Sequence, residues 1–204
     1  MDPKKIVKKG YDEIGGKYTA TRDENLAEMK LLTEFSEKIQ SNGKVLDLGC
    51  GGGVPFTKYL SEKFYITGVD LSPKQIERAR KNVPKARFIC EDMTMVNSPE
   101  NYYDGIYALY SIIHVPRNEH LTIFLNMYKM LKPGALLLVS LHSNDDPQSI
   151  YDDYFGTKMY WSGFDKDENI KLIEQADFEI IWTKLVQDSL SDSKHLFVLA
   201  QKPI

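Results

Sequence analysis

A short apolar run that ends in closely spaced glycines constrains the fold of this chain more than any other feature. Residues 45–48 read Val-Leu-Asp-Leu, and residues 49–53 read Gly-Cys-Gly-Gly-Gly. This pattern predicts a β-strand that leads into a turn stripped of side chains, where a ligand can approach the backbone closely. Residues 55–63 have a helical pattern, so we expect the turn to present backbone N–H groups at a helix N-terminus.

The spacing of these glycines distinguishes two kinds of nucleotide site. Gly49, Gly51 and Gly53 form a G-x-G-x-G pattern. The dinucleotide-binding fingerprint is G-x-G-x-x-G, and its last position would fall on Val54 or Phe56, depending on the glycine taken as the first. The spacing therefore weakens an NAD-binding interpretation.

Strand and helix patterns alternate along the chain. Strands are predicted at 44–48, 65–70, 86–90, 103–109 and 135–141, and helices at 24–40, from 73 onward, at 118–131 and at 165–177. The helix from 73 starts with a capping pattern, Ser-Pro-x-Gln. Residues 178–187 and 196–201 are predicted as two closing strands with no helix between them, which indicates a hairpin. This order predicts an α/β fold whose sheet is mostly parallel, with one antiparallel strand.

Two segments fall outside this alternation, the N-terminal region to about residue 23 and residues 142–164. The second segment is rich in aromatic and acidic residues, and a connection this long usually carries function or its own structure. Ligands of a parallel sheet bind beyond the carboxyl ends of its strands, and both segments could close over that edge. We therefore expect a single domain over residues 1–204, with a helical cap at 1–40 and a lid-like insertion at 142–166.

Acidic residues follow the first three predicted strands. Asp47 lies just before the glycine turn, Asp70 ends the second strand, and Asp92 follows the third. An acid in the position of Asp70 is placed to accept hydrogen bonds from ribose hydroxyls, and Asp92 could accept from the exocyclic amine of a base. Aspartate is common at such places as a turn former. The three acids in order with the glycine turn are hard to explain by chance.

Composition sets limits on the compartment and partners. The net charge of −3 argues against a large nucleic-acid interface. The sequence contains no run of 18 apolar residues that would span a membrane, and its charged start is unlike a secretory signal. Cys50 and Cys90 have no metal-binding spacing, and no set of His, Asp and Glu suggests a metal site. We expect a cytoplasmic protein that has two reduced thiols and does not associate with a membrane.

Taken together, these segments resemble the class I S-adenosylmethionine-dependent methyltransferases. Residues 45–53 resemble the first motif of that family, 69–72 its ribose-binding strand end, and 91–93 its adenine-contacting segment. Residues 103–107 and 131–135 resemble its fourth strand and the lead into the fifth. The resemblance implies a doubly wound, Rossmann-like sheet of seven strands, mostly parallel, with the last strand antiparallel and helices on both faces. It also implies S-adenosylmethionine as cofactor and S-adenosylhomocysteine as product.

The resemblance assigns residues to the methionine end of the cofactor. Gly49, Gly51 and the backbone of Cys50 would line this end, and Asp47 would sit near the cofactor's amino group. Tyr18, in a segment that resembles the N-terminal cap of the family, would reach its carboxylate.

The nucleoside end is assigned in the same way. Asp70 would hold the ribose, and Leu71 would pack on the adenine. Asp92 would take the adenine amine, and Met93 would add a backbone contact and an apolar wall.

Beneath the sulfonium, the resemblance places Leu109 and Tyr110 as a floor. Tyr11 is a weaker candidate, interpreted first as a packing residue. In-line methyl transfer requires the nucleophile to be aligned and held about 3–3.5 Å from the methyl group, with bulk water excluded. A base is needed only if the acceptor is protonated.

Two of the four histidines are candidates for that base. His114 follows the fourth strand and is the first choice for a catalytic residue, with packing as the alternative. His142 ends the fifth strand and is a similar candidate. His195 is interpreted as structural and away from the site, and His120 as a solvated helix residue.

The acceptor is less defined than the cofactor. Family members that methylate an exocyclic or amide nitrogen carry an Asp/Asn-Pro-Pro-Tyr/Phe motif after the fourth strand, whereas residues 109–112 here read Leu-Tyr-Ser-Ile. With the acidic pI of about 5.8, this favours transfer to oxygen or nitrogen of a small molecule. The aromatic and acidic residues of 151–164 would suit a cationic amine. A protein or RNA acceptor, and a non-catalytic cofactor-binding member, remain alternatives.

Overall fold

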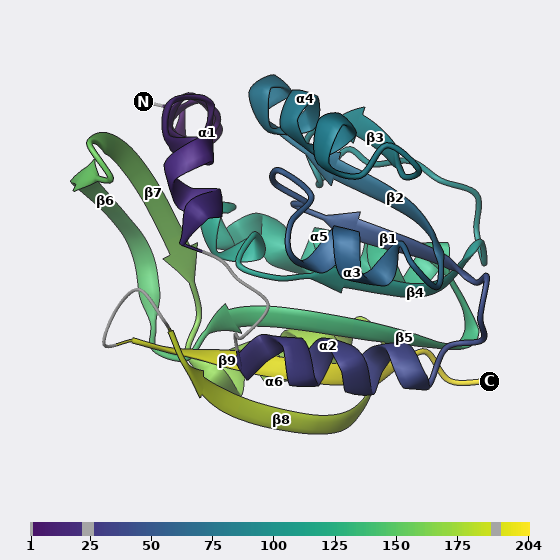
Figure 1. Ribbon diagram of the computed structural model, residues 1–204. Helices are drawn as coiled ribbons and strands as arrows, with labels where there is room; N and C mark the ends of the chain where they lie inside the picture. Colours follow the sequence, from purple (N-terminus) through teal and green to yellow (C-terminus); the bar gives the residue numbers. More distant parts are fainter. Residues whose placement is uncertain (1, 22–26, 189–192) are drawn as a thin grey trace.

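The computed structural model describes residues 2–21, 27–188 and 193–204. Its centre is a seven-stranded sheet with the order β3-β2-β1-β4-β5-β9-β8 (Figure 1). The strands are β1 (Lys44–Leu48), β2 (Tyr65–Asp70), β3 (Arg87–Cys90), β4 (Tyr103–Ala108), β5 (Leu131–His142), β8 (Glu179–Gln187) and β9 (Lys194–Gln201). The first five pair in parallel, and β9 runs antiparallel to both β5 and β8. The predicted fold class, including the antiparallel last strand, is confirmed.

Helices cover both faces of this sheet. They are α1 (Pro3–Ala20), α2 (Ala27–Glu37), α3 (Phe56–Leu60), α4 (Pro73–Asn82), α5 (His120–Met130) and α6 (Lys166–Gln175). Figure 1 shows α2 and α3 in front of the sheet and α5 and α6 behind it. Two short 3₁₀ turns, η1 (Ile112–His114) and η2 (Arg117–Glu119), connect β4 to α5.

The side chains of β5 show why the sheet is covered on both faces. Leu137, Val139 and Leu141 are buried in one cluster with the apolar residues of α5 and α6. Leu136 and Leu138 are buried in the other cluster, with those of α2. Successive strand residues point to opposite faces, so an uninterrupted apolar run fills two cores at once.

Some element boundaries differ from the prediction. Strand β5 begins at Leu131 rather than at residue 135, because the Lys-Pro-Gly segment is taken up as an irregularity in its pairing with β4. Helix α3 is shorter than the predicted 55–63 and ends at Leu60. The start of α4 is as predicted, since the Ser72 hydroxyl accepts a hydrogen bond from the Gln75 N–H.

The segment expected to act as a lid forms a hairpin of its own. Strands β6 (Asp146–Tyr154) and β7 (Thr157–Gly163) make a second, two-stranded sheet. Helix α1 packs on β7, where Ile6, Val7 and Ile14 form a small core with Met159 and Tyr160. Figure 1 shows α1 between this hairpin and α4, at the end of the sheet where β1, β2 and β4 finish.

Candidate active site

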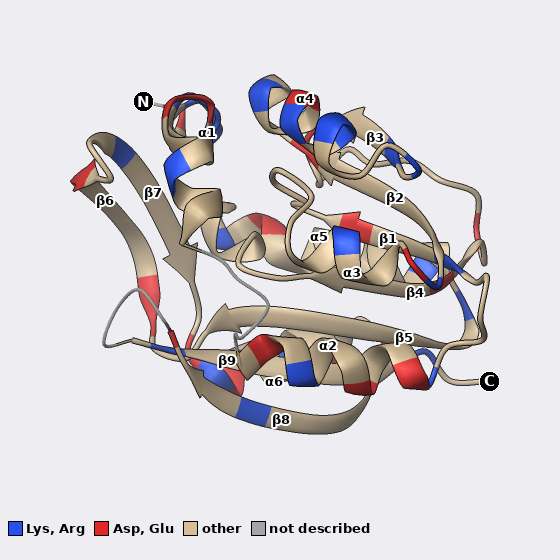
Figure 2. Cartoon of the chain, in the orientation of Figure 1, with Lys and Arg blue, Asp and Glu red and all other residues tan. Residues whose placement is uncertain are grey.

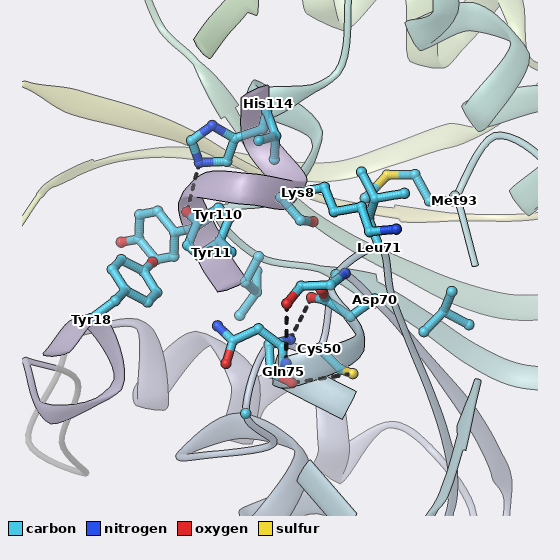
Figure 3. Close-up of a pocket in the computed structure, with 18 of the residues that line it drawn as sticks. Lys8, Tyr11, Tyr18, Cys50, Asp70, Leu71, Gln75, Met93, Tyr110 and His114 are labelled. Atoms are coloured by element: carbon cyan, nitrogen blue, oxygen red, sulfur yellow. Dashed lines mark hydrogen bonds between the residues drawn. The ribbon is translucent and has the colours of Figure 1, made fainter. Parts of the chain in front are cut away.

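A cavity of about 110 Å³ lies at the carboxyl ends of β1, β2 and β4, beneath α1. Eleven of the twelve predicted site residues line it: Tyr18, Gly49, Cys50, Gly51, Asp70, Leu71, Asp92, Met93, Leu109, Tyr110 and His114. In Figure 3, Tyr11, Tyr18 and His114 gather at one end of the cavity, and Asp70, Cys50 and Gln75 at the other. Eleven residues that the sequence analysis grouped into one site therefore share one cavity, and Asp47 does not line it.

Asp47 points away from this cavity. Its carboxylate accepts hydrogen bonds from the hydroxyls of Thr57 and Tyr107, and its side chain is buried. Burial raises the pKa of this carboxyl to about 7. Neighbouring residues of β1 face opposite sides of the sheet, and Asp47 lies on the side of α3. It braces this helix against β4 and does not line the cavity.

The glycine turn is shaped by close packing. Gly49, Gly51 and Gly53 have φ values of 87°, 52° and 79°, in the region that favours glycine. A Cβ on Gly49 would lie 2.1 Å from the Cβ of Ser111. The sequence did not single out Ser111, whose hydroxyl donates to the Leu48 carbonyl at 2.7 Å. No sequence signal identifies this contact, because it depends on how β4 and β1 are placed.

The turn does not offer the row of free N–H groups that was expected. The N–H groups of Gly49 and Cys50 both donate to the Val69 carbonyl, and that of Gly51 donates to Asp70. Helix α3 starts only at Phe56, so its N-terminus is not part of the turn. The turn therefore allows a close approach to the backbone rather than providing an anion-binding nest.

Asp70 is the buried acid of the cavity. Its two carboxylate oxygens accept hydrogen bonds from the N–H groups of Gly51, at 2.9 Å, and Ser72, at 2.8 Å. Burial raises the pKa of this carboxyl to about 6, despite the two hydrogen bonds. Each oxygen has lone-pair capacity for a further hydrogen bond, which fits a group with two neighbouring hydroxyls, such as ribose.

Asp92 lines the cavity but is already paired. Its carboxylate lies 2.8 Å from the Lys4 ammonium and also accepts hydrogen bonds from the backbone and hydroxyl of Thr94. Lys4 also contacts Glu119 at 2.5 Å, so this lysine ties α1 to two loops. No local sequence pattern identifies this pairing. An adenine amine would have to share Asp92 with this ammonium.

His114 and Tyr11 form a hydrogen-bonded pair at the aromatic end of the cavity (Figure 3). The Nδ1 atom of His114 lies 2.7 Å from the carbonyl of Tyr160, and a carbonyl can only accept, so Nδ1 carries the proton. Burial lowers the pKa of this imidazole to about 4, so the ring is neutral near pH 7. Its Nε2 lone pair then accepts the Tyr11 hydroxyl at 2.8 Å. Tyr11 is therefore more than the packing residue that the sequence suggested.

The other histidines occupy different places from those predicted. His120 is buried, 1% exposed, with its Nε2 atom 3.0 Å from the Val115 carbonyl, so the prediction of a solvated residue is wrong. His195 packs edge-on against Tyr110, with ring centroids 5.0 Å apart, rather than lying away from the site. The antiparallel pairing of β9 with β5 places His195 opposite His142, a register that the sequence alone does not fix.

A second cavity, of about 330 Å³, adjoins the first. Four side chains line both cavities: Tyr11, Tyr18, Tyr110 and His114. We call these four residues the neck. Beyond the neck, the second cavity is lined by the β6–β7 hairpin and by residues near the end of β5 and the start of β9, including His142 and His195. The arrangement provides two adjacent compartments that share an aromatic wall.

The first cavity is smaller than the roughly 300–1,000 Å³ typical of small-molecule sites. Helix α1 covers it and contributes Lys4, Val7, Lys8 and Tyr11 to its lining. We therefore expect α1 to move when a nucleoside-sized ligand enters.

Amide hydrogen exchange should show residues 3–20 opening more readily than α5 in the free protein, and becoming protected when S-adenosylhomocysteine is added. Helix α6 serves as the internal control, and equal exchange of α1 with and without ligand would contradict this expectation.

The described residues also bear on membrane-spanning and metal-binding functions. None of the described helices is long and apolar enough to cross a membrane. In the same part of the chain, no three His, Cys, Asp or Glu side chains are grouped so that they could hold a metal ion.

Comparison with known proteins defines the class. A family model described as "Methyltransferase domain" matches residues 18–185. The chain is 35% identical over 138 residues to phosphoethanolamine N-methyltransferase 1 of Arabidopsis thaliana, covering 62% of this chain and 27% of that protein. It is 31% identical over 153 residues to an uncharacterized methyltransferase of Synechocystis, covering 70% of each.

The fold is that of S-adenosylmethionine-dependent enzymes. The structure superposes on magnesium protoporphyrin IX methyltransferase from Synechocystis, with bound S-adenosylhomocysteine, at a TM-score of 0.75. The identity is 15%, and the match covers 98% of this chain and 100% of the other. The chain belongs to the class I S-adenosylmethionine-dependent methyltransferases, whose cofactor is S-adenosylmethionine. It spans only about a quarter of the plant enzyme's length, so the activity of that whole protein does not transfer with the match.

Proposed function

We propose that this protein transfers a methyl group from S-adenosylmethionine to an oxygen or nitrogen atom of a small molecule. The observation that carries the proposal is the neck, because Tyr11, Tyr18, Tyr110 and His114 line both cavities. A cofactor in the first cavity and an acceptor in the second would meet at these side chains. Both cysteines are free thiols, which supports a cytoplasmic location.

The residues of the first cavity suit the parts of the cofactor. The backbone at Gly49 to Gly51 allows close approach, Asp70 offers two acceptor oxygens for ribose, and Leu71 and Met93 add apolar surface. Bound there, S-adenosylmethionine supplies a methyl group that is already activated by its sulfonium. The protein then has to align the acceptor, exclude water and receive a proton.

Tyr11 and His114 are placed to receive that proton. The Tyr11 oxygen can accept a hydrogen bond from the acceptor while its own proton is directed at Nε2 of His114. The low pKa of His114 keeps its lone pair available at neutral pH. The same low pKa means that a protonated His114 ring releases its proton readily at neutral pH. The hydrogen bond from Nδ1 to the Tyr160 carbonyl fixes the tautomer that this role requires.

A macromolecular acceptor is less well supported. Figure 2 shows Lys and Arg residues on α4, but Lys81 there pairs with Glu77, and α4 does not contribute to the second cavity. A non-catalytic, cofactor-binding role would be supported only if no acceptor is methylated. The related plant enzyme is named for phosphoethanolamine, and a similar phosphate-bearing acceptor would require several cations in the second cavity. Among the described residues that line it, Lys194 is the only Lys or Arg.

The cofactor assignment is tested by calorimetry with S-adenosylmethionine across pH. Asp70 accepts hydrogen bonds from ribose best as a carboxylate, and its pKa of about 6 predicts that affinity declines as pH falls below that value. Asp70→Asn should weaken binding by about tenfold or more at pH 7.5, since a hydrogen bond to a charged group contributes about 1.5–3 kcal/mol. In this variant the affinity should be flat between pH 5 and 7. Unchanged affinity would refute the ribose assignment.

Methyl transfer itself is tested by following S-adenosylhomocysteine formation with a panel of small alcohols, amines and carboxylic acids. Product above the no-acceptor background supports the enzyme, and binding of the cofactor without any product supports the non-catalytic alternative.

A further inference from the structure

We propose that the second cavity binds a cationic amine that bears no phosphate or carboxylate, and that its nitrogen receives the methyl group. This inference rests on the proposed function, because it names the acceptor class of the same site. It is carried by the aromatic wall of the cavity and the charges that line it.

The wall is a set of aromatic rings suited to a cation. Trp161 contacts the ring of Tyr151 edge-on, with centroids 4.9 Å apart, and that of Tyr154 at the same distance. It also lies 5.3 Å from the ring of His114, which connects this cluster to the neck. The face of tryptophan attracts cations most strongly among side chains, followed by tyrosine. A cation beside Trp161 would lie next to the residues that separate the two cavities.

The charges favour the same sign of ligand. Asp146, Asp153 and Asp188 line the second cavity, against the one cation already named, Lys194. Figure 2 shows acidic positions on β6, the outer strand of the hairpin. His114 and His142 add little positive charge, because burial lowers the pKa of each to about 4. An anionic acceptor would meet repulsion from the carboxylates and few partners.

His195 forms part of the same wall. Its side chain lines the cavity and is only 6% exposed. Nε2 lies 3.4 Å from the Asp188 carboxylate, which can only accept, so Nε2 carries a proton. Nδ1 is buried and has no hydrogen-bond partner among the described residues. The pair places the acid Asp188 beside a ring that packs on Tyr110 of the neck.

Methyl transfer to such an amine moves one proton and one methyl group. The ammonium first loses one proton, which passes to the Tyr11 oxygen as the Tyr11 proton moves to Nε2 of His114. The nitrogen lone pair then forms the bond to the methyl carbon while the carbon–sulfur bond breaks, and that electron pair stays on sulfur. The products are a methylated ammonium and S-adenosylhomocysteine, and the transferred proton is released to solvent.

The test compares acceptors of matched size with the full chain and S-adenosylmethionine. One set is 2-phenylethylamine, 2-phenylethanol and 3-phenylpropionate, and another is ethanolamine, ethylene glycol and phosphoethanolamine. We expect N-methylated product from an amine in at least one set, at about tenfold higher kcat/KM than from its neutral or anionic counterparts. Faster methylation of an alcohol, a carboxylate or phosphoethanolamine overturns the inference but leaves the proposed function intact. Cofactor binding without methylation of any compound overturns both.

A pair of neighbouring residues provides a matched control for the charge argument. Asp153 lines the cavity, whereas Asp152 pairs with Lys158 at 2.7 Å and is not part of the lining. Asp153→Asn keeps an oxygen that can accept the Gly156 N–H, now 2.8 Å from Asp153, so the turn should persist. We expect this variant to raise the KM for the preferred amine by about fivefold with little change in kcat. Asp152→Asn should leave KM unchanged, and equal effects of the two variants contradict the proposal.

Discussion

Replacing His114 by asparagine should lower kcat for methyl transfer by about 10²–10⁴-fold, the usual contribution of a positioned proton acceptor. The asparagine amide can take the place of Nδ1 and donate to the Tyr160 carbonyl, which His114 now contacts at 2.7 Å. The variant therefore keeps the bond to β7 but has no counterpart of Nε2. Thermal unfolding within about 2–4 °C of wild type, the shift produced by about 1 kcal/mol in a chain of this size, would show that the fold is retained.

Tyr11→Phe is the partner variant, since it removes only the hydroxyl that lies 2.8 Å from Nε2. If the two residues act as a unit, this variant, His114→Asn and the double variant should show similar losses of kcat rather than losses that multiply. The dissociation constant for S-adenosylhomocysteine should change much less than kcat. Full turnover by either single variant would remove the pair from the mechanism.

Replacing Gly49 by alanine should destabilise the protein and abolish cofactor binding. The new Cβ would lie 2.1 Å from the Ser111 Cβ, at a φ of 87° that side chains rarely adopt. Left-handed backbone costs about 1–2 kcal/mol, and overpacking about 1–3 kcal/mol, so we expect a loss of about 2–5 kcal/mol in unfolding free energy. Denaturant unfolding and calorimetry with S-adenosylmethionine measure the two effects.

Two variants separate the causes. Gly16→Ala adds a Cβ that meets nothing within 4 Å, and it should leave stability the same or slightly higher. Adding Ser111→Gly to Gly49→Ala relieves the clash but retains the backbone strain, so part of the lost stability should return. A Gly49→Ala protein with wild-type stability and affinity would show that the turn tolerates a side chain.

The sequence was informative wherever a single local pattern fixes the structure. The apolar run of β5 predicted a strand and is typical of one buried on both faces, and the Ser72 cap predicted the start of α4. Glycines at positive φ marked the turn beneath the cavity. Asp70 was identified for the same reason. It ends a parallel strand next to the glycine turn, and such strand ends lie at the ligand-binding edge of the sheet.

Features that depend on packing between distant segments were not predicted. The Tyr11–His114 pair joins residues 103 positions apart, and no periodicity connects them. Asp47 was grouped with the cavity residues because the sequence does not show which face of β1 its side chain occupies. His195 was misplaced because the register of β9 against β5 decides whether it reaches the second cavity. In each case the missing information is the relative placement of two elements.

The separation of the small β6–β7 sheet from the seven-stranded sheet has an evolutionary consequence. The strand ends of the main sheet line the first cavity, whereas the hairpin lines part of the second. Under the proposed function, substitutions at hairpin positions that line only the second cavity, such as Asp153, would change acceptor preference while the contact between Tyr160 and His114 is kept. Enzymes with this fold could therefore diverge in substrate while keeping the same cofactor cavity.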